Sequence, residues 1–499
     1  MFLFNNNNKI ELNNLTISEA HKLLMTKKVT SVELTEFFLN RIKKLDKKLN
    51  TCLSVLNKES LIEAKLADDR ILKGETGDLL GIPYLLKDNI LVKGIKTTAG
   101  SKMLTNYIAP YNATVVKKLK EAGAVLLGKT NLDEFAHGSS TETSAFGVTK
   151  NPWDLSRVPG GSSGGSASAV AADFCIFALG SDTGGSIRQP ASFCGLTGFK
   201  PSYGRVSRFG LIAMTSSTDV IGPLTKTVED SAVVLQTIAG FDNFDLTTEK
   251  EVVPKYLKNI NKKIKGLKIG VVKEYLDDGL EVNIKKGIQE ALNTFKHLGA
   301  EIIDISLPYN KYSIPVYYII TPSEISANLA RLDGLRYGFS FKYEAKGKTE
   351  ENSSEIYMHN RGNSFGPEVK RRIMLGTYAL SSGYFDAYYK KAMAVKEKIK
   401  QEYKNIFNEV DVIITPTSPH VAFKIGEQVN DSLKMYLEDI FGVGPSLAGL
   451  PAISIPAGLS NGLPFGLQII ADKFKEEKVL NLAYNFQQVT AFHKHKPKF

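Results

Sequence analysis

The chain has 499 residues, of which 43% are hydrophobic and 9% aromatic, so it can bury a large core. No apolar run approaches the ~20 residues of a membrane-spanning helix, which argues against an integral membrane protein. The formal net charge of +11 permits attraction to an RNA-carrying assembly, but the basic residues are scattered and no RNA-binding motif accompanies them.

The first 75 residues predict a helical segment. The opening stretch MFLFNNNNKIELNN lacks the pattern of a secretory signal or a transit peptide, which favours a bacterial-like cytoplasmic location over the alternative, an organelle. Thr16–Glu19 has the pattern of a capping box at a helix start. Apolar residues at helical spacing then predict helices over Ser31–Leu45 and Leu61–Leu72.

Residues 76–240 are rich in glycine and serine and predict a catalytic core. Gly81–Asp88 reads as a short apolar strand that ends on Lys87 and Asp88. Thr114–Ala122 predicts a helix, Gly123 ends it, and Ala124–Gly128 predicts the next strand. Two Gly/Ser clusters, Gly160–Ser166 and Gly184–Ser186, bracket an apolar stretch that looks like packed structure rather than a linker.

The polar stretch Phe241–Lys265 separates this core from a second α/β part, residues 266–499. Its predicted strands and helices are Leu267–Val272, Asn283–Leu298, Glu301–Ser306, Tyr384–Tyr403, Asp411–Thr415, Ala452–Ile455 and Gly466–Ile470. Alternating strands and helices favour an α/β fold with a large mixed, mostly parallel central β-sheet and helices on both faces. We expect the three parts to form one domain over residues 1–499.

The two Gly/Ser clusters indicate nucleophilic chemistry, because each places hydroxyls beside backbone N–H groups that could hold an oxyanion. A serine nucleophile needs a base. His137 and His420 are the credible histidines, and Lys87 is the alternative because burial at a strand end lowers a lysine pKa. Gly160–Gly164 formally matches G-x-S-x-G, but no good strand precedes it, as a nucleophile elbow requires. The three cysteines lack metal-site spacing, so we expect no metal site.

The run GGSSGGSASAVAADFCIFALGSDTGGSIRQPASFCGLTGFKPSYGRVS closely resembles the amidase signature family, and GIPYLLKD matches that family's lysine motif. The resemblance covers nearly the whole chain. It implies a Ser–cis-Ser–Lys triad of Ser186 as nucleophile, Ser162 as proton relay and Lys87 as base. It also implies a cis peptide bond between Gly161 and Ser162.

The resemblance further implies that backbone N–H groups of Thr183, Gly184, Gly185 and Ser186 form the oxyanion hole. Asp182, Ser163 and Arg188 would hold the surrounding loops. For Arg188, an ion pair with a nearby acid and a role in binding substrate both remain open.

Flanking stretches such as VKRRIMLGTYALSSGYFDAYYKKA and MYLEDIFGVGPSLAGLPAISIP resemble the glutaminase subunits of tRNA-dependent amidotransferases. Glutamine carries a carboxylate and an ammonium, and the resemblance assigns these to Arg372 and Asp439, with Tyr317 also in the pocket. His137 stands where these subunits usually have Met, and Ser446 where Asn is common. Gly442–Gly444 also departs from their pattern.

The resemblance implies a heterotrimer with two other subunits, of the B and C type, that converts Glu-tRNA(Gln) to Gln-tRNA(Gln). Glutamine would be the donor and misacylated tRNA the acceptor. ATP and Mg²⁺ would be used by the assembly in a partner subunit, with no cofactor in this chain. The alternatives are a stand-alone amidase on small amides and a non-catalytic RNA-assembly scaffold.

Overall fold

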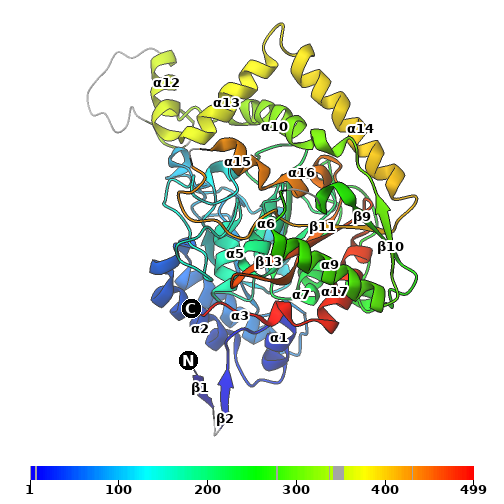
Figure 1. Cartoon of the computed structure of the whole chain (residues 1–499). Coiled ribbons are helices and arrows are strands. Elements are labelled where there is room, and N and C mark those ends of the chain that lie inside the picture. The colour runs from blue at the N-terminus through cyan, green and yellow to red at the C-terminus, as the bar shows by residue number, and fades with distance from the viewer. Residues whose placement is uncertain are drawn as a thin grey trace.

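The computed structural model describes residues 2–5, 8–276, 279–336, 338–340, 353–429 and 431–498. The central sheet contains β3 Cys52–Val55, β4 Pro83–Lys87, β5 Val125–Thr130, β6 Phe177–Asp182, β7 Thr197–Lys200, β8 Val220–Thr225, β9 Lys268–Val272, β10 Glu301–Ile305, β11 Val412–Pro416, β12 Ala452–Ser460 and β13 Leu463–Ala471. Their order is β10-β9-β11-β13-β12-β7-β8-β6-β4-β5-β3. A separate hairpin pairs β1 Phe2–Asn5 with β2 Asn8–Glu11 (Figure 1).

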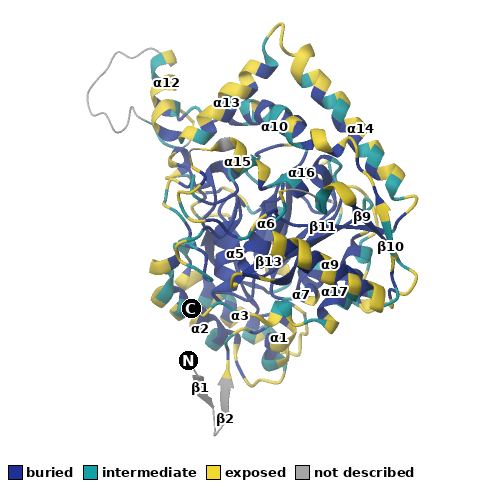
Figure 2. Ribbon diagram, in the orientation of Figure 1, coloured by how far each residue is buried: buried dark blue, intermediate teal, exposed yellow. Residues whose placement is uncertain are grey.

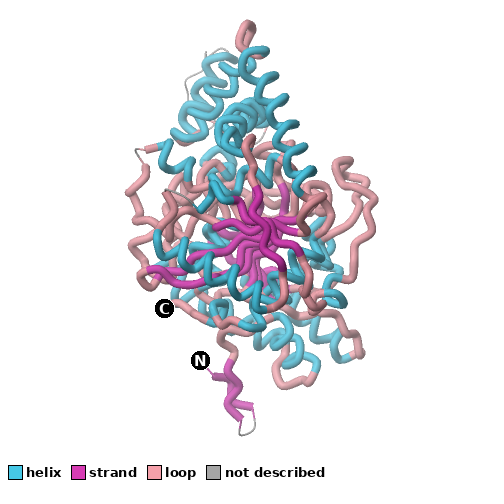
Figure 3. Tube along the Cα trace, turned by 45° about the vertical axis from the view of Figure 1, so that its right-hand side comes forward, coloured by secondary structure: helices cyan, strands magenta, loops and turns pink. Residues whose placement is uncertain are grey.

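Helices surround this sheet (Figure 3). They are α1 Ile17–Met25, α2 Ser31–Leu49, α3 Asn57–Leu72, α4 Thr114–Glu121, α5 Gly164–Ala171, α6 Arg188–Cys194, α7 Val228–Ile238, α8 Tyr256–Asn259, α9 Val282–His297, α10 Ser313–Leu329, α12 Ser353–Ser364, α13 Pro367–Leu380, α14 Lys391–Ile406, α15 Ser432–Leu437, α16 Ile440–Leu447 and α17 Glu476–Val489. Strands β4, β5 and β6 are buried along their whole length, as expected for strands covered on both faces. Figure 2 shows the centre of the molecule, around α5 and β13, in the dark blue of buried residues. The mixed α/β fold is therefore confirmed.

Most predicted elements are present with shifted ends. The capping box is confirmed, since the Thr16 hydroxyl accepts from Glu19 N and the Glu19 carboxylate accepts from Thr16 N. Helices α2 and α3 run four residues longer than predicted, at the C-terminal and N-terminal end respectively. The helix predicted from Tyr384 begins only at Lys391, because Asp386–Lys390 forms a π-helical turn before it.

The expectation that the sheet is mostly parallel is wrong. The pairs β10-β9, β9-β11, β6-β4 and β4-β5 are parallel, whereas the other neighbouring pairs are antiparallel. A strand buried on both faces is a continuous apolar run in either direction, so its composition does not reveal its orientation. One signal was present: Asn461 and Gly462, both with positive φ, join β12 to β13 in a two-residue hairpin turn.

Candidate catalytic residues lie at the carboxyl ends of two neighbouring strands in the sheet. Strands β4 and β6 are parallel neighbours, with Leu86 opposite Leu179, so Lys87 and Asp182 both lie at the carboxyl ends of these strands. Helices α10, α13 and α14 form an outer layer at the top of Figure 1. Strands from all three predicted parts of the chain join the sheet, and the proposed division at 1–75, 76–240 and 266–499 stays a prediction.

Candidate active site

Lys87, at the end of β4, lies at the centre of a cluster of buried serine hydroxyls. Its side chain is completely buried, and its Nζ lies 2.7 Å from Ser162 Oγ, 2.9 Å from Ser163 Oγ and 3.0 Å from Ser181 Oγ. Lys87 and Ser162 are separated by 75 residues in the chain, and the structure brings them into direct contact as the family resemblance implies.

Burial lowers the pKa of Lys87 from its ordinary value of 10.5 to about 7. The carboxylates of Asp133, Asp182 and Asp219 oppose this shift, because nearby negative charge favours the ammonium form. A lysine with this pKa is substantially neutral near pH 7 and can accept a proton there.

Ser162 is joined to Gly161 by a cis peptide bond, as the resemblance implies. Gly161 is packed so tightly that a Cβ would collide with the carboxylate of Asp133 and lie 2.5 Å from Ser140 N. Only glycine fits there. The glycine of this motif therefore serves close packing against the Asp133–Ser140 loop.

The second Gly/Ser cluster lies against the first. The backbone N–H of Ser163 donates to the carbonyl oxygen of Ser186 at 3.1 Å. Ser186 is 9% exposed, whereas Ser162 is completely buried. Of the two serines, Ser186 is thus the one that a substrate can reach.

Asp182 holds the loop that carries Ser186. Its Oδ1 accepts from Gly185 N at 2.9 Å, and its Oδ2 accepts from Ile187 N at 3.0 Å. The predicted oxyanion donor Gly185 is therefore engaged inside the protein. Thr183 is also fixed, because its hydroxyl donates to Asp219 Oδ1 at 2.7 Å.

Arg188 connects this loop to the C-terminal half of the chain. It forms a buried ion pair with Asp182, with Nη2 at 2.9 Å from Oδ1. It also donates to Gln468 Oε1 at 2.6 Å and to Ser446 Oγ at 2.8 Å. The expected ion pair of Arg188 is confirmed, and Ser446, one of the departures from the family pattern, accepts a hydrogen bond from it.

Tyr317 and Asp439 lie beside the same loop. A Cβ on Gly184 would lie 2.8 Å from the Tyr317 hydroxyl, and one on Gly185 would lie 3.2 Å from Asp439 Oδ1. Burial, together with the nearby Asp182, raises the pKa of Asp439 well above its ordinary value. A cation placed beside Asp439 would favour the charged carboxylate.

Arg372 projects from α13 and is 3% exposed. Its Nε donates to Glu368 Oε1 at 2.7 Å, and its guanidinium lies 5.4 Å from the centre of the Tyr318 ring and 5.7 Å from that of Tyr436. The rings of Tyr318 and Tyr436 stack with their centres 3.8 Å apart. Sequence reasoning missed Glu368, although the i, i+4 spacing to Arg372 is a known pairing signal.

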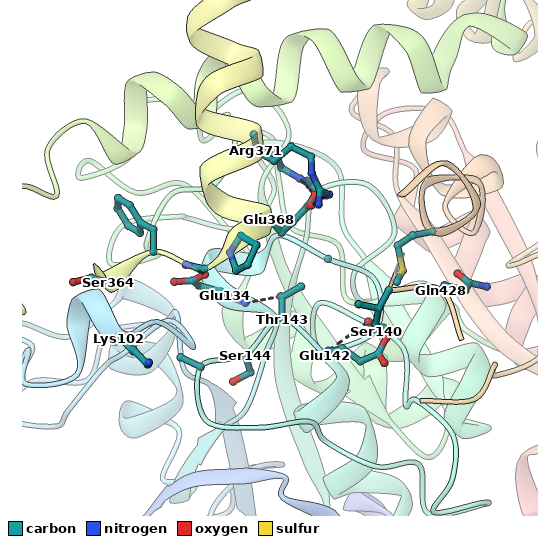
Figure 4. A pocket seen from close by; sticks show the side chains of 18 of the residues that line it. Lys102, Glu134, Ser140, Glu142, Thr143, Ser144, Ser364, Glu368, Arg371 and Gln428 are labelled. Carbon is teal, nitrogen blue, oxygen red and sulfur yellow. Dashed lines mark hydrogen bonds and ion pairs between the residues drawn. The ribbon is translucent and has the colours of Figure 1, made fainter. Parts of the chain in front are cut away.

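A cavity of about 570 Å³ adjoins Arg372. Figure 4 shows Glu368 and Arg371 projecting from one helix above the loop that carries Glu134 and Thr143. The buried Glu134 links the loop to this helix, because its Oε2 accepts from Gly366 N at 2.8 Å. Burial raises the pKa of Glu134 to about 7.

The two histidines considered as bases make other contacts. His137 Nδ1 lies 2.9 Å from the Glu134 carbonyl oxygen, and burial together with Arg372 lowers its pKa to about 3. His420 Nδ1 lies 3.2 Å from Glu438 Oε1. Neither is hydrogen-bonded to Ser162 or Ser186 in the described part of the chain, and the geometry favours Lys87 as the base.

Gly123–Thr130 spells G-A-V-L-L-G-K-T, which formally matches the phosphate-binding pattern G-x-x-x-x-G-K-T. That motif needs a glycine-rich loop opening a helix, but here Val125–Thr130 is strand β5. Lys129 is buried in an ion pair with Asp88 at 2.8 Å. These residues therefore do not form a phosphate-binding loop.

Two further features bear on ligand and membrane binding. No group of three or more His, Cys, Asp or Glu side chains within the described ranges is arranged to hold a metal ion. None of the helices in those ranges combines the length and apolar character that a bilayer span requires.

The chain is similar in sequence and in fold to known proteins. Residues 33–480 match the family model Amidase. The chain is 57% identical to the A subunit of glutamyl-tRNA(Gln) amidotransferase from Thermoanaerobacter pseudethanolicus, over 97% of this chain and 98% of that protein. It is 52% identical to the corresponding Carboxydothermus hydrogenoformans protein, over 98% and 100%. The crystal structure of the corresponding Thermotoga maritima protein superposes with a TM-score of 0.80 at 43% identity, over 96% of each chain. The chain belongs to the amidase family.

Proposed function

We propose that this chain is the glutamine-hydrolysing subunit of a tRNA-dependent amidotransferase that converts Glu-tRNA(Gln) to Gln-tRNA(Gln). The observation that carries the catalytic part is the 2.7 Å contact between the buried Lys87 Nζ and Ser162 Oγ. The proposed product is ammonia, which the assembly uses for amidation. Relatives that match this chain over nearly their full length are named as the A subunit of this amidotransferase.

Ser186 Oγ attacks the side-chain amide carbonyl of glutamine. Its proton passes to Ser162, whose own proton passes to neutral Lys87. The N–H groups of Thr183, Gly184 and Ser186 stabilise the oxyanion, since that of Gly185 is bonded to Asp182. The tetrahedral intermediate collapses as the leaving nitrogen takes the proton back from Lys87 through Ser162 and departs as ammonia. Water then hydrolyses the glutamyl ester on Ser186 and releases glutamate.

Arg372 and Asp439 select the donor. Because Glu368 engages Nε of Arg372, the two terminal amino groups of the guanidinium can take the glutamine α-carboxylate in a bidentate pair. Asp439 receives the α-ammonium, and this cation offsets the cost of keeping a buried carboxylate charged. Tyr317 lies against Gly184 and closes the same site.

The partners are two further subunits in a heterotrimer, and the acceptor is misacylated tRNA. ATP and Mg²⁺ act in a partner subunit, and the assembly works in the bacterial cytoplasm. Lys129, the lysine of the G-x-x-x-x-G-K-T match, is buried in an ion pair with Asp88, which supports placing ATP binding in a partner subunit.

The test is glutamine turnover by the full chain co-expressed with its partner subunits. Ser186→Ala should abolish glutamate release while leaving the assembly intact on gel filtration. Full activity in this variant would refute Ser186 as the nucleophile. Recovery of this chain without partners, with fast hydrolysis of small amides, would indicate a stand-alone amidase.

A further inference from the structure

The proposed base Lys87 contacts more hydroxyls than a proton relay needs. Only Ser162 belongs to the relay, yet Ser163 Oγ and Ser181 Oγ lie 2.9 Å and 3.0 Å from the same Nζ. All of these serines are at most 3% exposed, so no bulk water competes for the lysine. A neutral lysine has two N–H groups and one lone pair, and the rate of proton transfer depends on which neighbour the lone pair faces.

Ser163 has only one proton to donate. Its Oγ lies 3.1 Å from the carbonyl oxygen of Ser181, which can only accept, and it receives Ser181 N–H at 3.3 Å. With its proton directed to that carbonyl, Ser163 meets Lys87 as an acceptor. One N–H group of Lys87 therefore points at Ser163.

Ser181 is held from the other side by Asn89. Asn89 Nδ2 lies 3.0 Å from Ser181 Oγ, while Asn89 Oδ1 is buried without a partner among the described residues. A half-turn of the amide exchanges these two atoms, so that Oδ1 accepts the Ser181 proton and Ser181 Oγ meets Lys87 Nζ as an acceptor. Asn89 itself is two residues beyond Lys87, on the segment that leaves β4, so both groups that hold Ser181 come from one stretch of chain.

We propose that Ser163 and Ser181, the latter held by Asn89, are positioning residues that take two N–H groups of Lys87 and aim its lone pair at Ser162. This inference rests on the proposed role of Lys87 as the base. When Ser162 gives up its proton to Lys87 and takes the proton of Ser186, the third hydrogen of the new ammonium points back at Ser162. The three hydroxyls then accept the three hydrogens of the ammonium, and the Ser181 carbonyl oxygen is a longer contact at 3.4 Å from Nζ.

The pH dependence of kcat/KM for glutamine, measured on the assembly with partner subunits, tests the role of Ser181. Ser181→Ala removes an acceptor that binds the ammonium more strongly than the neutral amine, so the acid limb of the profile should move to lower pH by about half a unit or more. The plateau above the limb should fall about tenfold, because the lone pair is no longer held toward Ser162. The charged groups that face Lys87, namely Asp133, Asp182 and Asp219, are unchanged in this variant.

Ser166→Ala is the matched control. Ser166 is equally buried in the same core, but its Oγ contacts Thr130 Oγ1 and the Leu179 carbonyl oxygen rather than Lys87. It should leave the acid limb in place even if it lowers the melting temperature. Ser181→Thr retains a hydroxyl and should return the limb toward its original position.

A double variant tests whether Asn89 acts through Ser181. Asn89→Ala alone should shift the limb in the same direction as Ser181→Ala, whereas adding it to Ser181→Ala should produce no further shift. An unmoved limb in Ser181→Ala, with Lys87→Ala still inactive, would overturn this inference and leave the proposed function standing. Neutral-pH activity in Lys87→Ala would instead overturn the proposed base itself.

Discussion

Gly442 packs directly onto Gly184, the glycine at the centre of the proposed oxyanion loop. A Cβ on Gly442 would collide with the Gly184 carbonyl oxygen and would lie 3.2 Å from Gly185 Cα. Gly442 lies in α16, three residues after Asp439. Because Gly442 has no side chain, α16, the helix that begins after Asp439, can contact the loop that carries Ser186.

Gly442→Ala should lower kcat for glutamine by about tenfold or more, because the added methyl displaces Gly184 from the oxyanion site. Steady-state kinetics of the assembly measures this effect. Gly362→Ala is the control, because Gly362 lies in α12 and nothing lies within 4 Å of a Cβ added there. The kcat of this variant should be unchanged. Equal activity of the two variants would contradict a role for this packing.

At saturating glutamine, the pH profile of kcat should show an acid limb set by Lys87. Below its pKa of about 7 the ammonium cannot accept a proton, so kcat should rise about tenfold per pH unit and level off above pH 7. Asp439, whose raised pKa also affects glutamine binding, contributes to the profile of kcat/KM. Lys200 is a second buried lysine whose pKa is about 7, but it donates to the carbonyl oxygens of Leu450 and Pro201. Lys200→Met should therefore retain the limb, whereas a profile that is flat from pH 5 to 8 in the unmodified protein would contradict a lysine base.

Arg372→Lys should raise KM for glutamine by about 30-fold, corresponding to ~2 kcal/mol, since a lysine cannot form the bidentate pair with the α-carboxylate. Hydrolysis of an amide without a carboxylate, such as propionamide, should change far less. Arg371→Lys provides the comparison, because Arg371 is adjacent in the same helix but its side chain is 45% exposed. An equal increase in KM for the two variants would show that Arg372 does not bind the α-carboxylate of glutamine.

Asp182→Asn should destabilise the protein by about 3–5 kcal/mol, because it leaves the buried guanidinium of Arg188 without a charged partner. Urea unfolding followed by circular dichroism measures the change. Glu397→Gln, which removes the exposed ion pair with Lys400, should cost less than about 1 kcal/mol. Similar costs for the two variants would show that Asp182 does not anchor the loop.

Local patterns predicted much of the fold. Caps and apolar spacing located α1, α2 and α9, and the strand that ends on Lys87 was found from its apolar run. Strand direction was not predictable in the same way, because burial on both faces erases the alternation that marks an exposed face. The Asn461–Gly462 turn shows that hairpin chemistry carried information that apolar runs did not.

Residues of the candidate active site could be predicted only where they lie within long sequence motifs. Lys87, Ser162 and Ser186 lie far apart in sequence, and a lysine after an apolar run is by itself an ordinary strand end. Contacts such as Asn89 with Ser181, or Arg188 with Gln468, arise from strand order and leave no local trace in the sequence. The GKT letters at Gly128–Thr130 illustrate the converse, since a matching pattern without its strand–loop–helix context carries no chemistry.

The bond from Arg188 to Gln468 joins residues 280 positions apart, and it bears on how the protein is made. At about 5–20 residues per second, a ribosome needs roughly 15–60 s after Arg188 to synthesise Gln468. Throughout that interval the nascent chain already contains Lys87, Ser162 and Ser186 but lacks the strand that secures their loop. We therefore expect glutamine hydrolysis to begin only after this strand has been made, and a chain truncated before Gln468 to be inactive.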